Sequence, residues 1–75
     1  SSAAVDSKML ADALALFGYG AVDLDPGIPP RLANAGSQHL VIALHSRAAL
    51  SRLAYDLDAG KRFMLAHGLV TVMFI

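Results

Sequence analysis

The sequence contains more apolar residues than a chain of its length can bury by itself. Of its 75 residues, 56% are apolar and 16% are charged, whereas about a quarter of the residues of a soluble domain are charged. A chain this short buries only about 60% of its unfolded surface when it folds. The sequence therefore predicts one domain at most, with apolar surface left over for further polypeptide or a second copy to cover.

Charge and cysteine content exclude several classes of protein. The sequence has no cysteine, which excludes a disulfide framework and a thiolate metal site and leaves the cytoplasm as the expected compartment. The formal net charge is zero and the only basic cluster is Lys61 with Arg62, so nucleic acid is not an expected partner. The longest apolar runs, 40–44 and 69–75, are far shorter than the roughly 20 residues that span a bilayer, so no membrane partner is expected.

Apolar spacing predicts three helices. The first is expected to start at Asp6, which caps its first turn, and to end at Gly18 in the left-handed conformation. The second is expected over 46–53, with Ser46 as its N-cap. The third is expected to follow Asp56 and to end at Gly68. The apolar residues that the last two helices are expected to bury are Ala49, Leu50, Leu53, Leu57, Gly60, Phe63 and Met64.

Three extended segments are predicted at 31–34, 39–44 and 69–75. The run at 39–44 is continuously apolar, which favours a strand covered on both faces. The loop at 18–30 contains Pro26 and Gly27, which suit the centre of a type II turn. The resulting order α-β-β-α-α-β predicts an α+β fold with a partial mixed β-sheet and packed helices.

The two ends of the sequence carry an expectation of their own. It opens on Ser-Ser-Ala-Ala without an initiating Met or a charged leader, and it finishes on the apolar segment 69–75. Domains seldom finish on such a segment, because an exposed apolar strand pairs with other chains. Both features predict that residues 1–75 are a partial domain cut from a longer protein.

The acidic and histidine residues are expected to serve structure rather than catalysis. The six acidic residues are all aspartates, and five of them lie where helices start or beside the Pro-Gly turn, where a short carboxylate bonds nearby backbone N–H groups. His39 and His45 bracket one strand about 20 Å apart, too far to share a metal ion. His67 lies in a last helical turn, where its charged form is favoured. No catalytic residue, metal site or cofactor is predicted.

One polar turn is a candidate for ligand contact. Ala35, Gly36 and Ser37 connect two buried extended segments, and small residues there leave backbone N–H groups free to approach a carboxylate. These three residues are the predicted substrate-binding site.

The order of several segments resembles the second lobe of the PhzF-like proteins of phenazine biosynthesis. The Leu-Asp-Pro and Pro-Pro loop, the small-residue turn and the His-Leu-Val strand all lie within Gly20–Leu44, and the likeness continues through 46–53, 55–58 and 65–72. It covers nearly the whole chain from Asp6 onward. The resemblance implies a diaminopimelate epimerase-like fold, in which two lobes each curl a mixed sheet around a central helix, and residues 1–75 would be the first half of the second lobe.

The resemblance also implies an activity for the parent protein. PhzF-like enzymes isomerise small carboxylates without metal or cofactor, by general acid-base catalysis between the lobes. The glutamate that moves the proton in the family has no counterpart here, since the sequence contains no Glu. Diaminopimelate epimerases bind substrate through an Asn at the position of Ser37, so this position departs from that pattern. The chain is therefore expected to be second-lobe scaffold, inactive alone, with the rest of the enzyme or a second copy as its partner.

Two other functions fit the same composition. The apolar excess is also expected of a small, non-catalytic homo-oligomeric module, such as a dimer, that covers its surface with copies of itself. A sensor of small ligands built on the turn at 35–38 is the third possibility.

Overall fold

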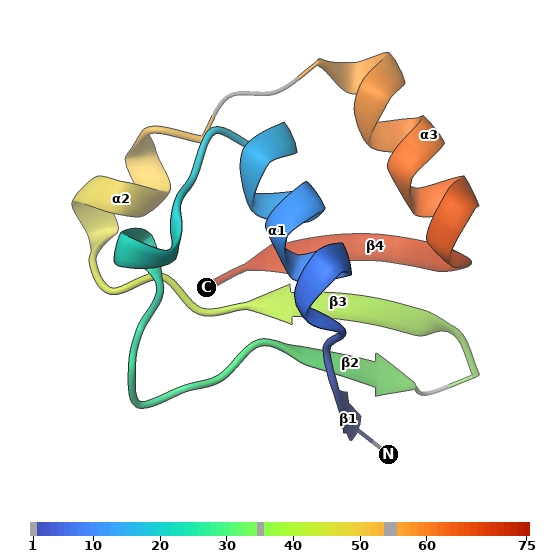
Figure 1. Ribbon diagram of the computed structural model, residues 1–75, viewed down its shortest axis with the longest axis horizontal. Helices are drawn as coiled ribbons and strands as arrows, with labels where there is room; N and C mark the ends of the chain where they lie inside the picture. Colours follow the sequence, from blue (N-terminus) through green and yellow to red (C-terminus); the bar gives the residue numbers. More distant parts are fainter. Residues whose placement is uncertain (1, 35, 54–55) are drawn as a thin grey trace.

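The computed structural model describes residues 2–34, 36–53 and 56–75. Figure 1 shows a four-stranded sheet with helices packed against it, which confirms the predicted α+β class. In chain order the elements are β1 (Ser2–Ala4), α1 (Ser7–Leu16), the short 3₁₀ turn η1 (Ala21–Asp23), β2 (Arg31–Asn34), β3 (Gln38–Ile42), α2 (Arg47–Ser51), α3 (Leu57–His67) and β4 (Leu69–Phe74). None of the helices in the described ranges is long and apolar enough to cross a lipid bilayer.

The sheet is mixed and has the strand order β1-β2-β3-β4. β2 runs antiparallel to both β1 and β3, whereas β4 runs parallel to β3. A parallel pair needs a long crossover connection. α2 and α3, which lie between β3 and β4 in the chain, form this connection. β1 is not predicted by the sequence pattern, because three small residues carry no alternation and become a strand only through pairing with β2.

Side-chain caps start the three α-helices at the predicted residues. The side chains of Asp6, Ser46 and Asp56 each accept a hydrogen bond from the backbone N–H three residues later, at 3.3, 3.1 and 3.0 Å. Gly18 and Gly68 follow the ends of α1 and α3 with φ values of 80° and 65°. Both glycines therefore adopt the left-handed conformation that stops a helix.

We expect Gly68→Ala to lower the free energy of unfolding by about 1 to 2 kcal/mol, because a Cβ is strained in the left-handed region. Chemical denaturation followed by circular dichroism measures the change. Gly20→Ala is the matched control, since Gly20 has a φ of −122° and, its chain neighbours apart, no heavy atom would lie within 4 Å of a Cβ at this position. Equal losses in the two variants would contradict the assignment of strain to Gly68.

The core lies between one face of the sheet and the helices. Leu40 and Ile42 of β3 have no exposed surface, and their partners across the parallel pair are Val72 and Phe74. The helices contribute further buried residues to the same cluster: Met9, Ala13 and Leu14 from α1 and Ala49 from α2. Figure 1 shows α1 lying across the sheet, with α3 beside it and rising from the start of β4.

Three expectations about burial and turn type are wrong. Only alternate residues of β3 are fully buried, so one face of that strand is covered where two are expected. Leu50, Leu53 and Leu57, which are expected to be buried, are 37%, 39% and 59% exposed. Apolar spacing locates one side of a helix but does not show that another element packs against it.

The predicted turn does centre on Pro26 and Gly27, and the Ile28 N–H donates to the Asp25 carbonyl. It is not a type II turn, because Gly27 lacks the positive φ that this type requires.

Candidate functional site

The predicted substrate-binding turn joins β2 to β3. Asn34 and Gln38 are the last paired residues of this hairpin. Between them Gly36 is exposed with a φ of 86°, and Ser37 is half-buried. Ala35 lies outside the described residues. A backbone that needs glycine at the tip suits the close approach of a ligand, and contact of Gly36 and Ser37 with a substrate stays a prediction.

A polar cluster lies at the opposite end of β3, where η1 meets the chain after the strand. Asp23 is 8% exposed, and its carboxylate accepts hydrogen bonds from the Gly20 N–H at 3.0 Å and from Nη2 of Arg52. The Gly20 N–H holds the pKa of Asp23 below its usual 3.8; burial opposes this shift, and the charges of Arg52 and His45 assist it. The cluster thus keeps Asp23 ionised.

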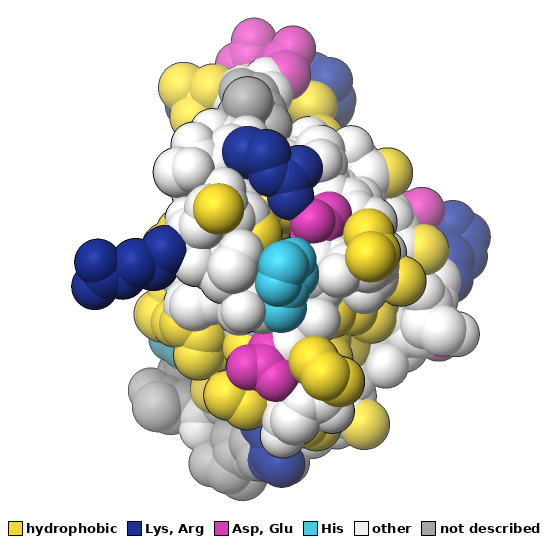
Figure 2. Space-filling view, turned by 90° about the vertical axis from the view of Figure 1, so that its left-hand side faces the viewer, with side chains coloured by type: hydrophobic (Ala, Val, Ile, Leu, Met, Phe, Trp, Pro, Cys, Tyr) yellow, Lys and Arg dark blue, Asp and Glu magenta, His cyan; other side chains and the backbone are white. Residues whose placement is uncertain are grey.

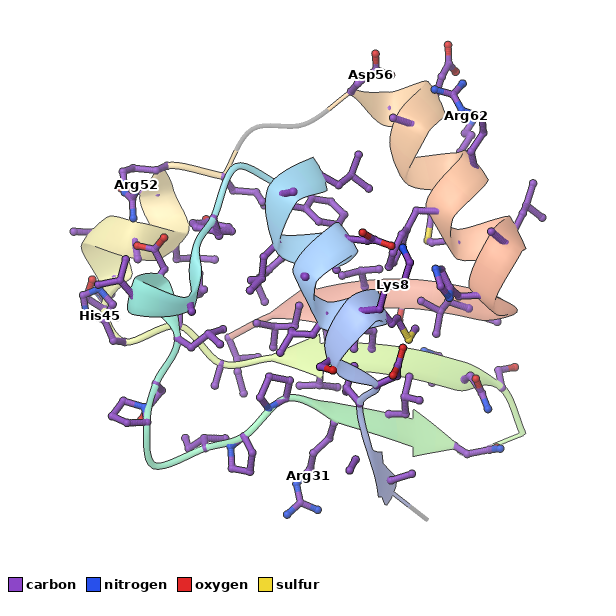
Figure 3. The ribbon with its side chains drawn as sticks, viewed as in Figure 1. Lys8, Arg31, His45, Arg52, Asp56 and Arg62 are labelled. Carbon is purple, nitrogen blue, oxygen red and sulfur yellow. The ribbon has the colours of Figure 1, made fainter. Side chains whose placement is uncertain are left out.

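The same cluster ties α2 to the loop after α1. The Tyr19 hydroxyl donates to the Ala49 carbonyl at 2.8 Å, and the guanidinium of Arg52 lies 5.7 Å from the centre of the Tyr19 ring. Figure 3 shows Arg52 at the end of α2 and His45 below it, both beside η1. Figure 2 shows this face, where a histidine near the centre lies between acidic and basic side chains. From the sequence, Asp23 is predicted only to lie beside a turn. Its ion pair could not be predicted, because its partner Arg52 is 29 residues away.

Three other polar residues considered from the sequence, Asp25, His39 and His67, each contact a side chain or backbone group elsewhere than in the Asp23 cluster. Asp25 accepts from the Gly27 N–H at 2.8 Å, which confirms its role in the turn. Nδ1 of His39 lies 2.7 Å from Oγ1 of Thr71, and the His67 ring lies 4.6 Å from that of Phe63. In the ranges that the structure describes, no three His, Cys, Asp or Glu residues come together as metal ligands would.

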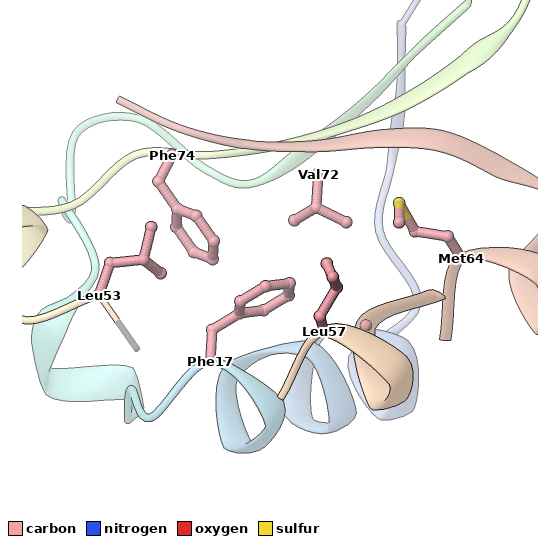
Figure 4. A pocket seen from close by; sticks show the side chains of 7 residues that line it. Phe17, Leu53, Leu57, Met64, Val72 and Phe74 are labelled. Atoms are coloured by element: carbon pink, nitrogen blue, oxygen red, sulfur yellow. The ribbon is translucent and has the colours of Figure 1, made fainter. Parts of the chain in front are cut away.

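An apolar cavity lies between β4 and the helices, and no sequence pattern indicates it. It has a volume of about 130 Å³. None of the described residues that line it is charged or polar, and Figure 4 shows Val72 and Phe74 directed from β4 toward Phe17. The remaining lining residues are Leu53, Leu57, Gly60 and Met64. Leu53 and Leu57, which are partly exposed, are among these lining residues.

Comparisons with known proteins add no relative. A scan against protein-family models finds no match, and searches of curated proteins and of solved structures find none either. The function is therefore inferred from the residues and their geometry.

Proposed function

We propose that the chain is second-lobe scaffold of a PhzF-like isomerase, which moves a proton on a small carboxylate by general acid-base catalysis. In this proposal the chain supplies part of a mixed sheet and a substrate-facing turn at Gly36 and Ser37. The proton-moving group belongs to the rest of the enzyme. The basis for the family is the resemblance of the sequence from Asp6 onward.

The observation that carries the proposal is that Gly20–Leu44, the longest stretch of resemblance, forms one closed unit. Residues 24 and 25 meet the end of the stretch, because the Asp25 N–H donates to the Ala43 carbonyl at 2.9 Å and Leu24 bridges to Leu44. The hairpin of β2 and β3 lies between these ends and carries Gly36 and Ser37 at its tip. A closed unit of this kind can present the turn to a cleft formed with another lobe.

The placement of the carboxylates also supports a scaffold role. Asp6 and Asp56 cap helices, Asp25 closes a turn, Asp23 pairs with Arg52, and Asp12 pairs with Lys8 at 3.0 Å. A general base must reach the proton that it removes. These five of the six aspartates are bonded to their own backbone or to basic side chains, which is consistent with the proposal that the base comes from other polypeptide.

A chimera tests the proposal. Residues 6–75 would replace the corresponding segment of a PhzF-like isomerase of known activity, and incorporation of solvent deuterium into its substrate would be measured in D₂O. We expect the chimera to retain activity and the isolated chain to have none. A chimera with the same segment in scrambled order is the control. Turnover by the isolated chain, or a folded chimera without activity, would overturn the proposal.

A further inference from the structure

Among the described residues, no further strand pairs with the outer edge of β4. The Ile75 N–H donates to the Ile42 carbonyl at 3.1 Å, and the Ile75 carbonyl accepts from the Leu44 N–H at 2.9 Å. Ile75 therefore faces β3, and because strand residues alternate in direction, the N–H and C=O groups of Val72 and Phe74 point away from it. β4 is the last strand of the sheet in the described part of the chain, so these groups form a template for one more strand.

β4 also lacks the features that usually protect an exposed edge. Leu69–Phe74 contains no charged residue and no proline, whereas natural edge strands are commonly short or carry Lys or Pro. The other edge strand, β1, has only three residues. On β4 and after it, Val70, Met73 and Ile75 are 57%, 47% and 57% exposed.

The apolar cavity lies beside this same edge. Val72 and Phe74, whose backbone groups point outward, also line the cavity with their side chains. Figure 1 shows the upper end of α1 and most of α3 extending past β4, on the side away from β3. A strand added to β4 would therefore run beneath these helices. A cavity of about 150 Å³ holds a benzene molecule, so 130 Å³ accepts about one branched or aromatic side chain.

We propose that β4 binds an extended segment of another polypeptide, which adds a fifth strand and inserts an apolar side chain into the cavity lined by Phe17, Leu57, Met64, Val72 and Phe74. Residues on one face of the added strand meet the helices, so its sequence alternates apolar and polar residues. The sheet edge and the cavity carry this inference, which does not depend on the isomerase proposal.

A second copy fits this edge less well than an extended segment. Two copies that pair β4 with β4 about a two-fold axis perpendicular to the sheet place their helices on the same face of the joined sheet. Because α1 and α3 already extend over the space beside β4, the helices of a second copy would meet them there. An extended segment brings no helices and occupies only the strand position.

Titration with a synthetic peptide tests the inference. The probe alternates valine with threonine between terminal lysines, and the control peptide has proline in place of the central valine, since proline removes a ladder hydrogen bond. We expect the probe to slow hydrogen exchange at the amides of Val72 and Phe74 and the control peptide to leave it unchanged. Protection elsewhere in the chain, or equal effects of the two peptides, would overturn the inference.

Two matched variants distinguish insertion of a peptide side chain into the cavity from non-specific binding of the peptide to exposed apolar residues. Leu57 lines the cavity and is 59% exposed, whereas Leu65, further along α3, is 82% exposed and does not line it. We expect Leu57→Lys to weaken peptide binding at least tenfold and Leu65→Lys to leave it unchanged. Leu57→Ala serves if the lysine variant does not fold. Equal weakening by Leu57→Lys and Leu65→Lys, or a discrete dimer in sedimentation that protects the Val72 and Phe74 amides without peptide, would show that the inference is wrong.

Discussion

Replacing Ile42 by alanine is expected to lower the free energy of unfolding by about 2 to 5 kcal/mol, the usual cost of truncating a buried isoleucine. Ile42 has no exposed surface and lies on β3, the strand between β2 and β4 in the sheet. A domain of this length has a total stability of only about 4 to 11 kcal/mol. The variant should therefore lose a large share of its stability and unfold at a much lower urea concentration, which urea denaturation followed by circular dichroism measures.

Val22→Ala is the control for this loss. Val22 is also β-branched, but it lies in η1 and is 84% exposed. A substitution at such a surface position usually changes stability by no more than about 0.5 kcal/mol. Similar urea midpoints for the Ile42 and Val22 variants would mean that the core is not centred on β3.

Most of the backbone elements could be predicted from the sequence because they have local causes. A cap such as Asp6 acts three residues away, and a glycine such as Gly68 acts at its own φ angle. The helices, the main strands and the α+β class follow from such signals together with apolar spacing. β1 has no local signal, and it exists only because β2 pairs with it.

The sites could be predicted far less well, because they depend on residues that are distant in the sequence. The pair of Asp23 with Arg52 joins residues 29 apart, and no spacing rule connects them. The cavity depends on how far α3 stands from α1, which apolar periodicity does not determine. Leu57, which lines the cavity, is exposed although apolar spacing predicts burial for it. The position of the Gly36 turn could be predicted, because glycine and serine between two strands are a local signal, and its contact with a substrate stays a prediction.

The Asp23 carboxylate is expected to make the stability of the chain fall in acid. Its pKa in the folded state lies below 3.8, chiefly because the Gly20 N–H donates to it and secondarily through Arg52. A group with a lowered folded-state pKa stabilises the fold fully above its unfolded pKa, and this contribution is lost as the pH falls through the folded value. The contribution of Asp23 should therefore be constant at neutral pH and decline below about pH 3.8.

Asp23→Asn tests this dependence, because it removes the titrating group while keeping an oxygen that can accept from Gly20. We expect the difference in unfolding free energy between the original chain and the variant to be largest at neutral pH and to shrink as the pH falls below about 3.8. Asp12→Asn is the matched control, since Asp12 pairs with Lys8 on an exposed helix surface, where ion pairs contribute little. Denaturation at a series of pH values measures both. A difference that does not vary with pH would show that Asp23 stabilises the loop by shape alone, and the ion pair with Arg52 would then have no energetic role.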